Sequence, residues 1–382
     1  MPYSPSVTEA KPYIGGQAVL EGVMMRAPSC MTVAVRRPDG TLAVKEELLK
    51  PRSKSLAKVP FVRGMAMLGE SMKLGYRALQ FSADQQMLGA PAKDASVATT
   101  LAAALTAVRA AALGVFLGVD GSEPAPGGAA SKDAKMDAPS STAAIALSIV
   151  IAIGLFIALP QALAWGLGKG LGLTLTVSDW RYQATIGGFK LLVITAYMVF
   201  LSRVPEMRRV FQYHGAEHKT IYAYEAAQPL TLENVRAQST LHPRCGTTFL
   251  IVVVAVSVLV FIAVAPFVTF MTGPLGQLQV FALRLALLPV IAGVAYELQR
   301  LTARYCTTGP MRVFLWPGFL FQKITTREPD DAQLEVAIVA MKAAEWRDQH
   351  QGAALPAEPA VYPSFAEYVA SLSPAAAAPE AA

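Results

Sequence analysis

Four long apolar stretches constrain the fold of this chain more than any other feature of its sequence. Each reaches or approaches the ~20 mostly apolar residues that a helix needs to cross the hydrocarbon core of a bilayer. Hydrophobic residues make up 53% of the chain and charged residues only 16%, whereas an ordinary soluble domain is about 25% charged. The sequence therefore predicts an α-helical polytopic membrane protein with about four transmembrane helices, at residues 143–166, 186–201, 247–271 and 278–297.

The basic residues predict which way these helices point. They gather before the first span, between the second and third spans, and after the fourth, whereas the connector 167–183 holds two and the connector 272–277 holds none. Four spans place every basic segment on one side, which the positive-inside rule assigns to the cytoplasm. A weaker apolar stretch, 101–119, would reverse this arrangement as a fifth span. We therefore expect an interfacial helix there, within a linker at 86–141, and cytoplasmic N- and C-termini.

Two basic residues, Lys190 and Arg284, fall inside the predicted spans. A charge within the membrane is costly and often marks a functional site. Both residues lie toward the outer ends of their spans, where a long side chain can reach the membrane interface. A polar pathway between the second and fourth spans is the alternative.

The N-terminal region, residues 13–60, predicts a small cytoplasmic β unit. Residues 31–36 and 41–47 alternate in polarity on either side of a Pro-Asp-Gly turn, which is typical of a β-hairpin. The glycine-framed run 15–26 favours a further strand. From residue 61 to residue 85 the apolar residues recur at helical spacing, so we expect an amphipathic helix that lies on the membrane or on the β unit.

The C-terminal region predicts a helical tail on the cytoplasmic side, at residues 300–350. A helix beginning after Pro329 would place Leu334, Ile338 and Met341 on one face, with acidic residues at its N-terminal end. Residues 351–382 are rich in alanine and proline, so we expect them to be mostly disordered apart from a short turn near 365–372.

One constellation of side chains suggests chemistry. Three of the four histidines of the chain and one of its three cysteines fall in the segment 204–246, between the second and third spans. On a helix, His214 and His218 are one turn apart and point the same way, and Glu225 returns to within about 20° of His214. A turn can aim His242 and Cys245 at one point. The candidate metal ligands are therefore His214, His218, His242, Cys245 and Glu225.

Two imidazoles followed by a later imidazole or thiolate form the ligand set that Zn²⁺ favours. The order His-x-x-Glu-His also matches the inverted zincin motif, in which the glutamate is the general base, so Glu217 is the candidate catalytic residue. Four protein ligands would make a closed structural site, whereas three ligands plus water would make a catalytic one. The sequence leaves both open, together with the plain alternative of histidines that only pack.

Four longer strings carry a resemblance to a known family. They are GGQAVLEGVMMR at 15–26, FQYHGAEHKTIYAYE at 211–225, LHPRCGTTF at 241–249 and ITTREPDD at 324–331. With them the chain resembles the YqhQ-like family of uncharacterised bacterial membrane proteins. The resemblance implies a multi-pass protein of the bacterial inner membrane, with a predicted metal-dependent activity and a candidate site at His214, His218, His242 and Cys245. Other candidates to line the same cavity are Glu21, Arg26, Arg327, Glu328 and Asp330.

These features favour a metal-dependent hydrolase that acts at the membrane surface, with zinc as the cofactor and Glu217 as general base. Two alternatives are a non-enzymatic membrane scaffold with a structural metal site and a small transporter that uses Lys190 and Arg284. The expected partners are the lipid bilayer and either a protein or a substrate at the membrane surface. Nucleic-acid binding is disfavoured, because the topology already accounts for the basic residues.

Overall fold

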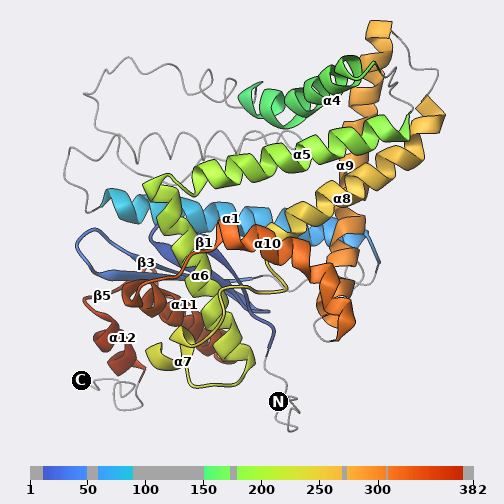
Figure 1. Cartoon of the computed structure of the whole chain (residues 1–382). Helices are drawn as coiled ribbons and strands as arrows, with labels where there is room; N and C mark the ends of the chain where they lie inside the picture. The colour runs from blue at the N-terminus through green and yellow to red at the C-terminus, as the bar shows by residue number, and fades with distance from the viewer. Residues whose placement is uncertain are drawn as a thin grey trace, which may run out of the picture.

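The computed structural model describes residues 12–49, 59–88, 150–172, 179–268, 273–306 and 309–372. Most of the predicted linker 86–141, including its helix at 101–119, lies outside these residues. The described chain forms two regions that differ in character: a β-sheet packed between helices, and a group of long apolar helices above it (Figure 1).

The sheet has five antiparallel strands whose spatial order follows the chain. The predicted hairpin forms its centre, because the alternating residues of its two strands pair from Cys30 with Leu48 to Arg36 with Leu42. The strands are β1 (Gly15–Val19), β2 (Gly22–Arg26), β3 (Cys30–Arg36), β4 (Leu42–Leu48) and β5 (Ala360–Tyr362).

Two parts of this sheet differ from the sequence prediction. The run 15–26 is two strands rather than one, and it turns at Leu20 and Glu21, where Glu21 has a positive φ of 49°. Strand β5 lies in the segment expected to be mostly disordered, whereas the helix α12 (Phe365–Ser371) lies where the short turn near 365–372 was expected. That segment is ordered because its strand pairs with β4, a contact that composition does not reveal.

Helices cover both faces of the sheet (Figure 1). On β3, the side chains of Met31, Val33 and Val35 pack toward α1 (Val62–Met87). The alternate residues Cys30 and Ala34 pack on the opposite face, against α6 (Pro205–Glu225) and α11 (Asp331–Gln349). Because successive side chains of a strand point to opposite faces, β3 contributes to two separate hydrophobic cores.

Helix α11 is a central element rather than a peripheral tail. The Asp330 side chain accepts a hydrogen bond from the backbone N–H of Gln333, and the Gln333 side chain accepts one from the backbone N–H of Asp330, so a capping box starts the helix. Eleven of its nineteen residues are buried, on more than the one face predicted from its sequence. The extra burial arises because α11 lies between the sheet and α6.

Among the described residues, four helices are long and apolar enough to cross a membrane: Val150–Gly170, Trp180–Leu201, Gly246–Phe267 and Gln279–Tyr305. They include α4 (Leu159–Gly170), α5 (Trp180–Leu201), α8 (Gly246–Val264) and α9 (Gly273–Tyr305). At most 28% of the most apolar window of each is buried within the protein. Their side chains therefore face outward, as expected for helices whose solvent is lipid.

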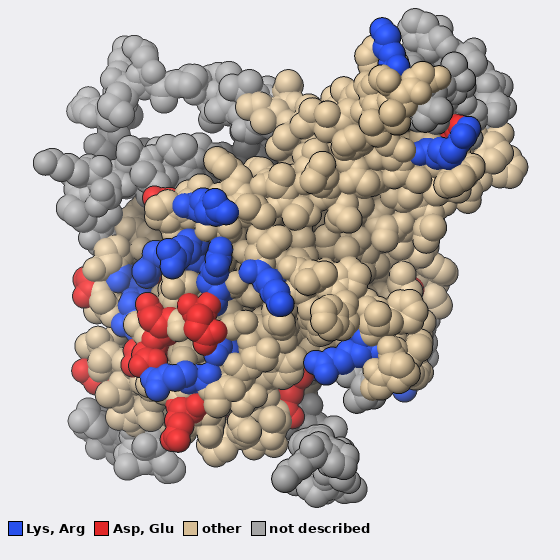
Figure 2. Space-filling model, viewed as in Figure 1, with Lys and Arg blue, Asp and Glu red and all other residues tan. Residues whose placement is uncertain are grey.

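The two regions are joined by close contacts between α1 and α9. Tyr296 of α9 packs where a side chain at Gly64 of α1 would stand, and Arg63 forms an ion pair with Glu297. Charged side chains gather over the sheet-centred region in Figure 2, whereas the surface above α5 and α8 is almost uncharged until its far end. The apolar helices thus pack against the sheet-centred region, whose surface is charged.

Candidate metal centre

Helix α6 presents the two histidines of the inverted zincin motif. The helix starts with Pro205 in its first turn, followed by Glu206, which suits the positive end of the helix dipole. His214 and His218 lie one turn apart, and the centroids of their rings are 4.5 Å from one another. The spacing in the sequence therefore becomes a real pair of neighbouring imidazoles.

Cys245 completes a cluster with these two histidines. It is the N-cap of α8, where its Sγ accepts a hydrogen bond from the backbone of Thr247 at 3.4 Å. The Sγ atom lies 3.1 Å from Nε2 of His214. One ligand atom from each of His214, His218 and Cys245 lies within 4.8 Å of the other two. We call these three residues the His/Cys cluster.

Backbone carbonyls determine which ring nitrogen carries the proton in both histidines of the cluster. Nδ1 of His214 lies 2.8 Å from the carbonyl of Thr325, and Nδ1 of His218 lies 2.5 Å from that of Thr240. Because a carbonyl oxygen can only accept, each Nδ1 carries a proton, and in the neutral ring the lone pair is then on Nε2. For His214 this lone pair faces Sγ of Cys245. Burial also lowers the pKa of His218, which favours the neutral ring. This is the outer arrangement typical of metal-binding histidines.

The donor set fits a transition metal of the zinc type. Neutral imidazole nitrogen and cysteine sulfur are ligands of Zn²⁺, whereas calcium and magnesium prefer oxygen. Ligand atoms lie about 2.0–2.3 Å from a bound Zn²⁺, so atoms at most 4.8 Å apart can share one ion after small side-chain movements. His214, His218 and Cys245 would hold that ion.

His242 stands beside the cluster rather than in it. Its ring centroid is 5.6 Å from that of His218, and its Nδ1 accepts a hydrogen bond from the backbone of Arg244 at 3.3 Å. The proton is therefore on Nε2, which lies 3.5 Å from a carboxylate oxygen of Glu225 and has no hydrogen-bond partner among the described residues. Its tautomer is the opposite of the one found in His214 and His218.

Glu225 does not reach the cluster, although its helical angle matches that of His214. Eleven residues separate the two, which at ~1.5 Å per residue is roughly 16 Å along the axis of α6. The carboxylate instead forms an ion pair with Arg244 and faces His242. Glu225 thus contacts two residues that neighbour the cluster. The helical angle alone did not predict its position, because it ignores the rise along the helix axis.

Glu217 lies on α6 between the two histidines and is only 5% exposed. Burial raises the pKa of its carboxyl group to about 7. Space for this side chain depends on Gly16 of β1, because a Cβ atom there would lie 2.6 Å from Cγ of Glu217. The second glycine of the first string, Gly16, therefore has a local reason.

A cavity of about 770 Å³ opens beside the cluster, between α6, α1 and the first two strands. Its volume is in the range of small-molecule sites. Apolar side chains form much of its wall, among them Met24, Met67, Leu74 and Phe211. His214, His218, Cys245, His242 and Glu217 all line it, together with two cations, Arg26 and Arg244. A ligand in this cavity would contact both the cluster and an apolar surface.

The five other candidates from the four strings have separate roles. Only Arg26 lies among the described residues that line the cavity, where it pairs with Glu70 at 2.7 Å. Arg327 donates its backbone N–H to Phe211, Glu328 pairs with Lys219, and Asp330 caps α11. Arg327 and Glu328 thus fasten the segment before α11 to α6.

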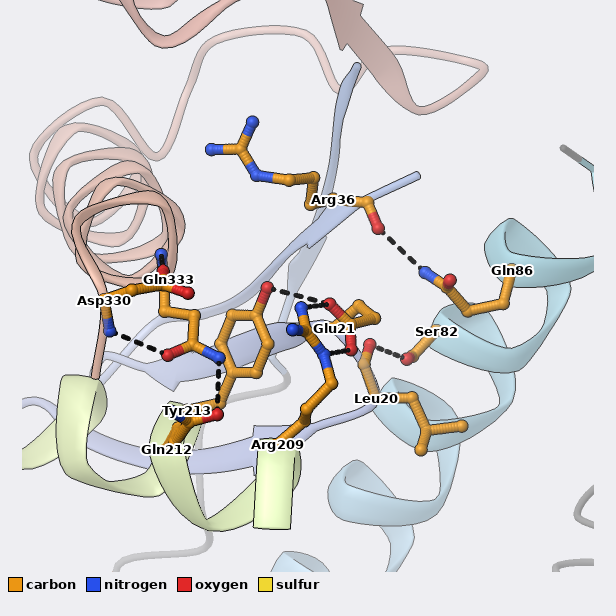
Figure 3. Close-up of polar contacts among 10 residues, drawn as sticks. All are labelled: Leu20, Glu21, Arg36, Ser82, Gln86, Arg209, Gln212, Tyr213, Asp330 and Gln333. Atoms are coloured by element: carbon orange, nitrogen blue, oxygen red, sulfur yellow. Dashed lines mark hydrogen bonds and ion pairs between the residues drawn. The ribbon is translucent and has the colours of Figure 1, made fainter. Parts of the chain in front are cut away.

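Glu21 is part of a second cluster, away from the cavity wall (Figure 3). Its carboxylate accepts two hydrogen bonds from Arg209, both at 2.5 Å, and a longer one from the hydroxyl of Tyr213 at 3.3 Å. The carbonyl of neighbouring Leu20 accepts a hydrogen bond from Ser82 of α1. The tip of the first hairpin is therefore held by α6 and α1 together, which supports its left-handed residue.

Sequence reasoning missed the groups that support the histidines. Gln322 of α10 (Trp316–Thr325) accepts a hydrogen bond from the backbone of His242 and donates one to its carbonyl, both at 2.8 Å. The partners at Thr325 and Thr240 are backbone carbonyls, which every residue has, so no residue type in the sequence indicates them. The only signal was that Thr325 belongs to one of the four strings of the resemblance.

Comparison with known proteins agrees with that resemblance. The family described as "Protein of unknown function (DUF1385)" matches residues 59–346. The "Uncharacterized protein YqhQ" of Bacillus subtilis (strain 168) is 33% identical over 329 residues, which cover 86% of this chain and 90% of that protein. No solved structure matches the chain. The chain therefore belongs to the DUF1385 family, and it is similar to YqhQ.

Proposed function

We propose that this protein is a metal-dependent hydrolase of the bacterial inner membrane, with the His/Cys cluster holding a Zn²⁺-type ion at the membrane surface. The observation that carries the proposal is the convergence of two imidazoles and one thiol on a single point. Carbonyls accept from Nδ1 of both imidazoles, so in the neutral rings the lone pairs are on Nε2, the nitrogen that would bind the ion.

Three protein ligands leave a position free on a four-coordinate ion, which is typical of catalytic zinc. A bound ion of this type supplies a Lewis acid that activates water near neutral pH. Glu217 would accept the proton from that water, because it lines the same cavity and lies next to His218 in the chain. Arg244, fixed by its ion pair with Glu225, would orient an anionic group of the substrate.

The cavity favours an amphiphilic ester or amide as the substrate. Its wall combines apolar side chains from α1 and the sheet with the two arginines. The same helix α1 exposes Phe61, Val62 and Met65 at the end that contacts α9. An amphiphile could therefore leave the bilayer along α1 and place its polar end at the cluster.

The charge distribution supports a cytoplasmic position for this region and for both termini. Lys169 and Arg181 are the two basic residues around the connector of α4 and α5, and the connector of α8 and α9 has none. The other end of α5 leads directly into α6, and α8 starts beside the His/Cys cluster, so both helices reach the sheet-centred region, where charged side chains gather in Figure 2. This asymmetry satisfies the positive-inside rule if the sheet-centred region lies in the cytoplasm.

Elemental analysis of the purified protein in detergent tests the metal site. We expect close to one zinc per chain in the wild type and a loss of most of it in His214→Ala/His218→Ala. His350→Ala is the matched control, because His350 stacks on Trp346 at the far end of α11. Equal metal content in all three proteins would exclude the cluster as the site.

The hydrolase role has its own test. Wild type and Glu217→Gln are assayed against p-nitrophenyl esters with acyl chains of increasing length, presented in micelles. We expect the variant to keep its zinc and to lose about 10²–10⁴-fold in rate, the usual contribution of a general base. A variant that hydrolyses as fast as wild type, or a wild type without turnover of any ester or matching anilide, would reject the hydrolase.

A membrane scaffold with a structural metal site is the second candidate, and one observation favours it. The cluster and its supporting carbonyls connect α6, the loop before α8, and the end of α10. An ion there would fasten three segments that are distant in sequence. If His242 changed its tautomer and joined the ion, the site would have four protein ligands and be closed. Zinc that raises stability without any turnover would identify this function.

A further inference from the structure

A second group of charged residues lies among the apolar helices, far from the His/Cys cluster. Helix α5 begins at Trp180, six residues before the predicted span, so Lys190 lies midway along it rather than near an end. Gln183 and Lys190 are seven residues apart, which places them within about 20° of one another on the helix. They form one stripe along α5.

Helix α8 packs directly on this stripe. Gly187 lies between Gln183 and Lys190, and a Cβ atom there would approach Cβ of Val258 to 3.3 Å and its methyl group more closely still. The absence of a side chain thus lets α8 come near. One turn further along α8, Phe261 stands against the same stripe.

Two cations contact this one aromatic ring. Nζ of Lys190 lies 5.5 Å from the ring centroid of Phe261, and Cζ of Arg284 of α9 lies 5.2 Å from it. The guanidinium also donates a hydrogen bond to Oε1 of Gln183 at 3.3 Å. Cation–π contacts offset part of the cost of these charges. They do not remove the repulsion between two like charges that share a ring.

No carboxylate neutralises this pair among the described residues. Asp179 is the nearest acid in the sequence of α5, and both of its oxygens bind Arg181. The connectors 173–178 and 269–278, which adjoin the same helix ends, contain no Asp or Glu in their sequence. Charged residues within membranes are normally paired. These two therefore need an anion from outside the helices.

We propose that Lys190, Arg284 and Gln183 form a binding site for a phosphate group, carried by a lipid headgroup or free in solution. The depth fits a headgroup, because Gln183 is only three residues, or roughly 5 Å, from the start of α5. A small cavity of about 20 Å³ lies against Arg284, Gln183 and Phe261. The guanidinium is thus not fully enclosed by side chains.

Phosphate suits these donors better than other anions do. The planar fork of an arginine binds two phosphate oxygens at once, and a lysine adds a point charge. Phosphate is also the anion that the lipid headgroups of a bilayer place near helix ends. The inference depends on insertion of the four helices and is independent of the metal site and of any hydrolysis.

Native mass spectrometry of the protein in detergent tests the site. Wild type, Lys190→Gln, Arg284→Gln and the double variant are titrated with phosphatidylglycerol, and separately with inorganic phosphate after lipid removal. We expect each single substitution to weaken phosphatidylglycerol binding about tenfold, as for the loss of one charge-assisted hydrogen bond, and the double variant to lose it. Saturable binding of inorganic phosphate that also requires both cations would identify free phosphate as the ligand.

Lys169→Gln is the matched control, because Lys169 is an exposed cation that also stands over an aromatic ring, that of Trp165 at 5.2 Å. A charge-preserving variant, Lys190→Arg/Arg284→Lys, separates charge from folding and should recover most of the binding. Each variant is first compared with wild type by size exclusion and circular dichroism. If the double variant binds both ligands as tightly as Lys169→Gln does, the proposal is wrong.

Discussion

Helices α8 and α11 have the same length, nineteen residues, yet they meet opposite environments. Helix α8 contains no charged residue, and only three of its side chains are buried in the protein. Helix α11 contains six charged residues, and eleven of its residues are buried. The more apolar helix is thus the less buried one.

This contrast shows that the apolar composition of a helix does not predict how much of it is buried within the protein. Helix α11 reaches its partners through the layers of the sheet-centred region, so its packing depends on the sheet, α6 and the capping box. Helix α8 has an apolar surface on all sides, which requires an apolar solvent. The comparison therefore separates positions where protein packs against protein from those where lipid would do so.

Matched truncations should show the largest difference between the two helices. Ile338→Ala in α11 removes a side chain with no exposed surface, whereas Leu259→Ala in α8 removes one that is 65% exposed. We expect the first to cost about 4 kcal/mol and the second less than about 1 kcal/mol, because lipid tails are as apolar as leucine. Thermal unfolding in nanodiscs, followed by tryptophan fluorescence, measures both. Equal losses would mean that α8 is packed against protein.

Two adjacent glutamates sharpen the comparison within the sheet-centred region. Glu46 pairs with Arg347 of α11, whose side chain is 2% exposed, and Glu47 pairs with Arg77 of α1, whose side chain is 55% exposed. Glu46→Gln leaves a buried charge without its carboxylate and should cost about 3 kcal/mol. Glu47→Gln should cost less than about 1 kcal/mol, because water screens that pair. Denaturant titration of the two variants gives the difference, and a larger loss for Glu47→Gln would reverse the assignment of the two faces.

A smaller effect is expected where the sheet meets the candidate site. Gly16→Ala forces Glu217 to move and should cost about 1–2 kcal/mol by overpacking. Gly15→Ala is the control, because its Cβ would meet nothing closer than 3.7 Å. We expect Gly16→Ala to keep its zinc while its ester hydrolysis falls. Identical behaviour of the two alanine variants in stability and rate would show that Glu217 does not depend on this contact.

The sequence predicted the elements that depend on local pattern. Long apolar runs marked the four membrane-length helices, and alternation marked β3 and β4. It could not place β5, whose three residues are ordered only by pairing with β4, more than 300 residues away in the chain. It also treated α11 as a tail, because burial between two layers is a property of the whole fold.

In the candidate site, too, the sequence predicted what depends on local pattern and missed what depends on the whole fold. The spacing of His214 and His218 correctly predicted neighbouring rings, since it follows from one helical turn. Glu225 was included on helical angle alone, and the rise along α6 separates it from the cluster. For His242, the deciding fact is a hydrogen bond from the backbone of Arg244 to its Nδ1, which no pattern of residues reveals.

X-ray absorption at the zinc edge tests the central proposal, that His214, His218 and Cys245 hold one ion. For zinc-loaded wild type we predict one sulfur neighbour at about 2.3 Å and nitrogen or oxygen neighbours at about 2.0–2.1 Å. In Cys245→Ser the sulfur neighbour should disappear while the nitrogen shell persists. A wild-type spectrum without sulfur, or one that Cys245→Ser leaves unchanged, would contradict the assignment.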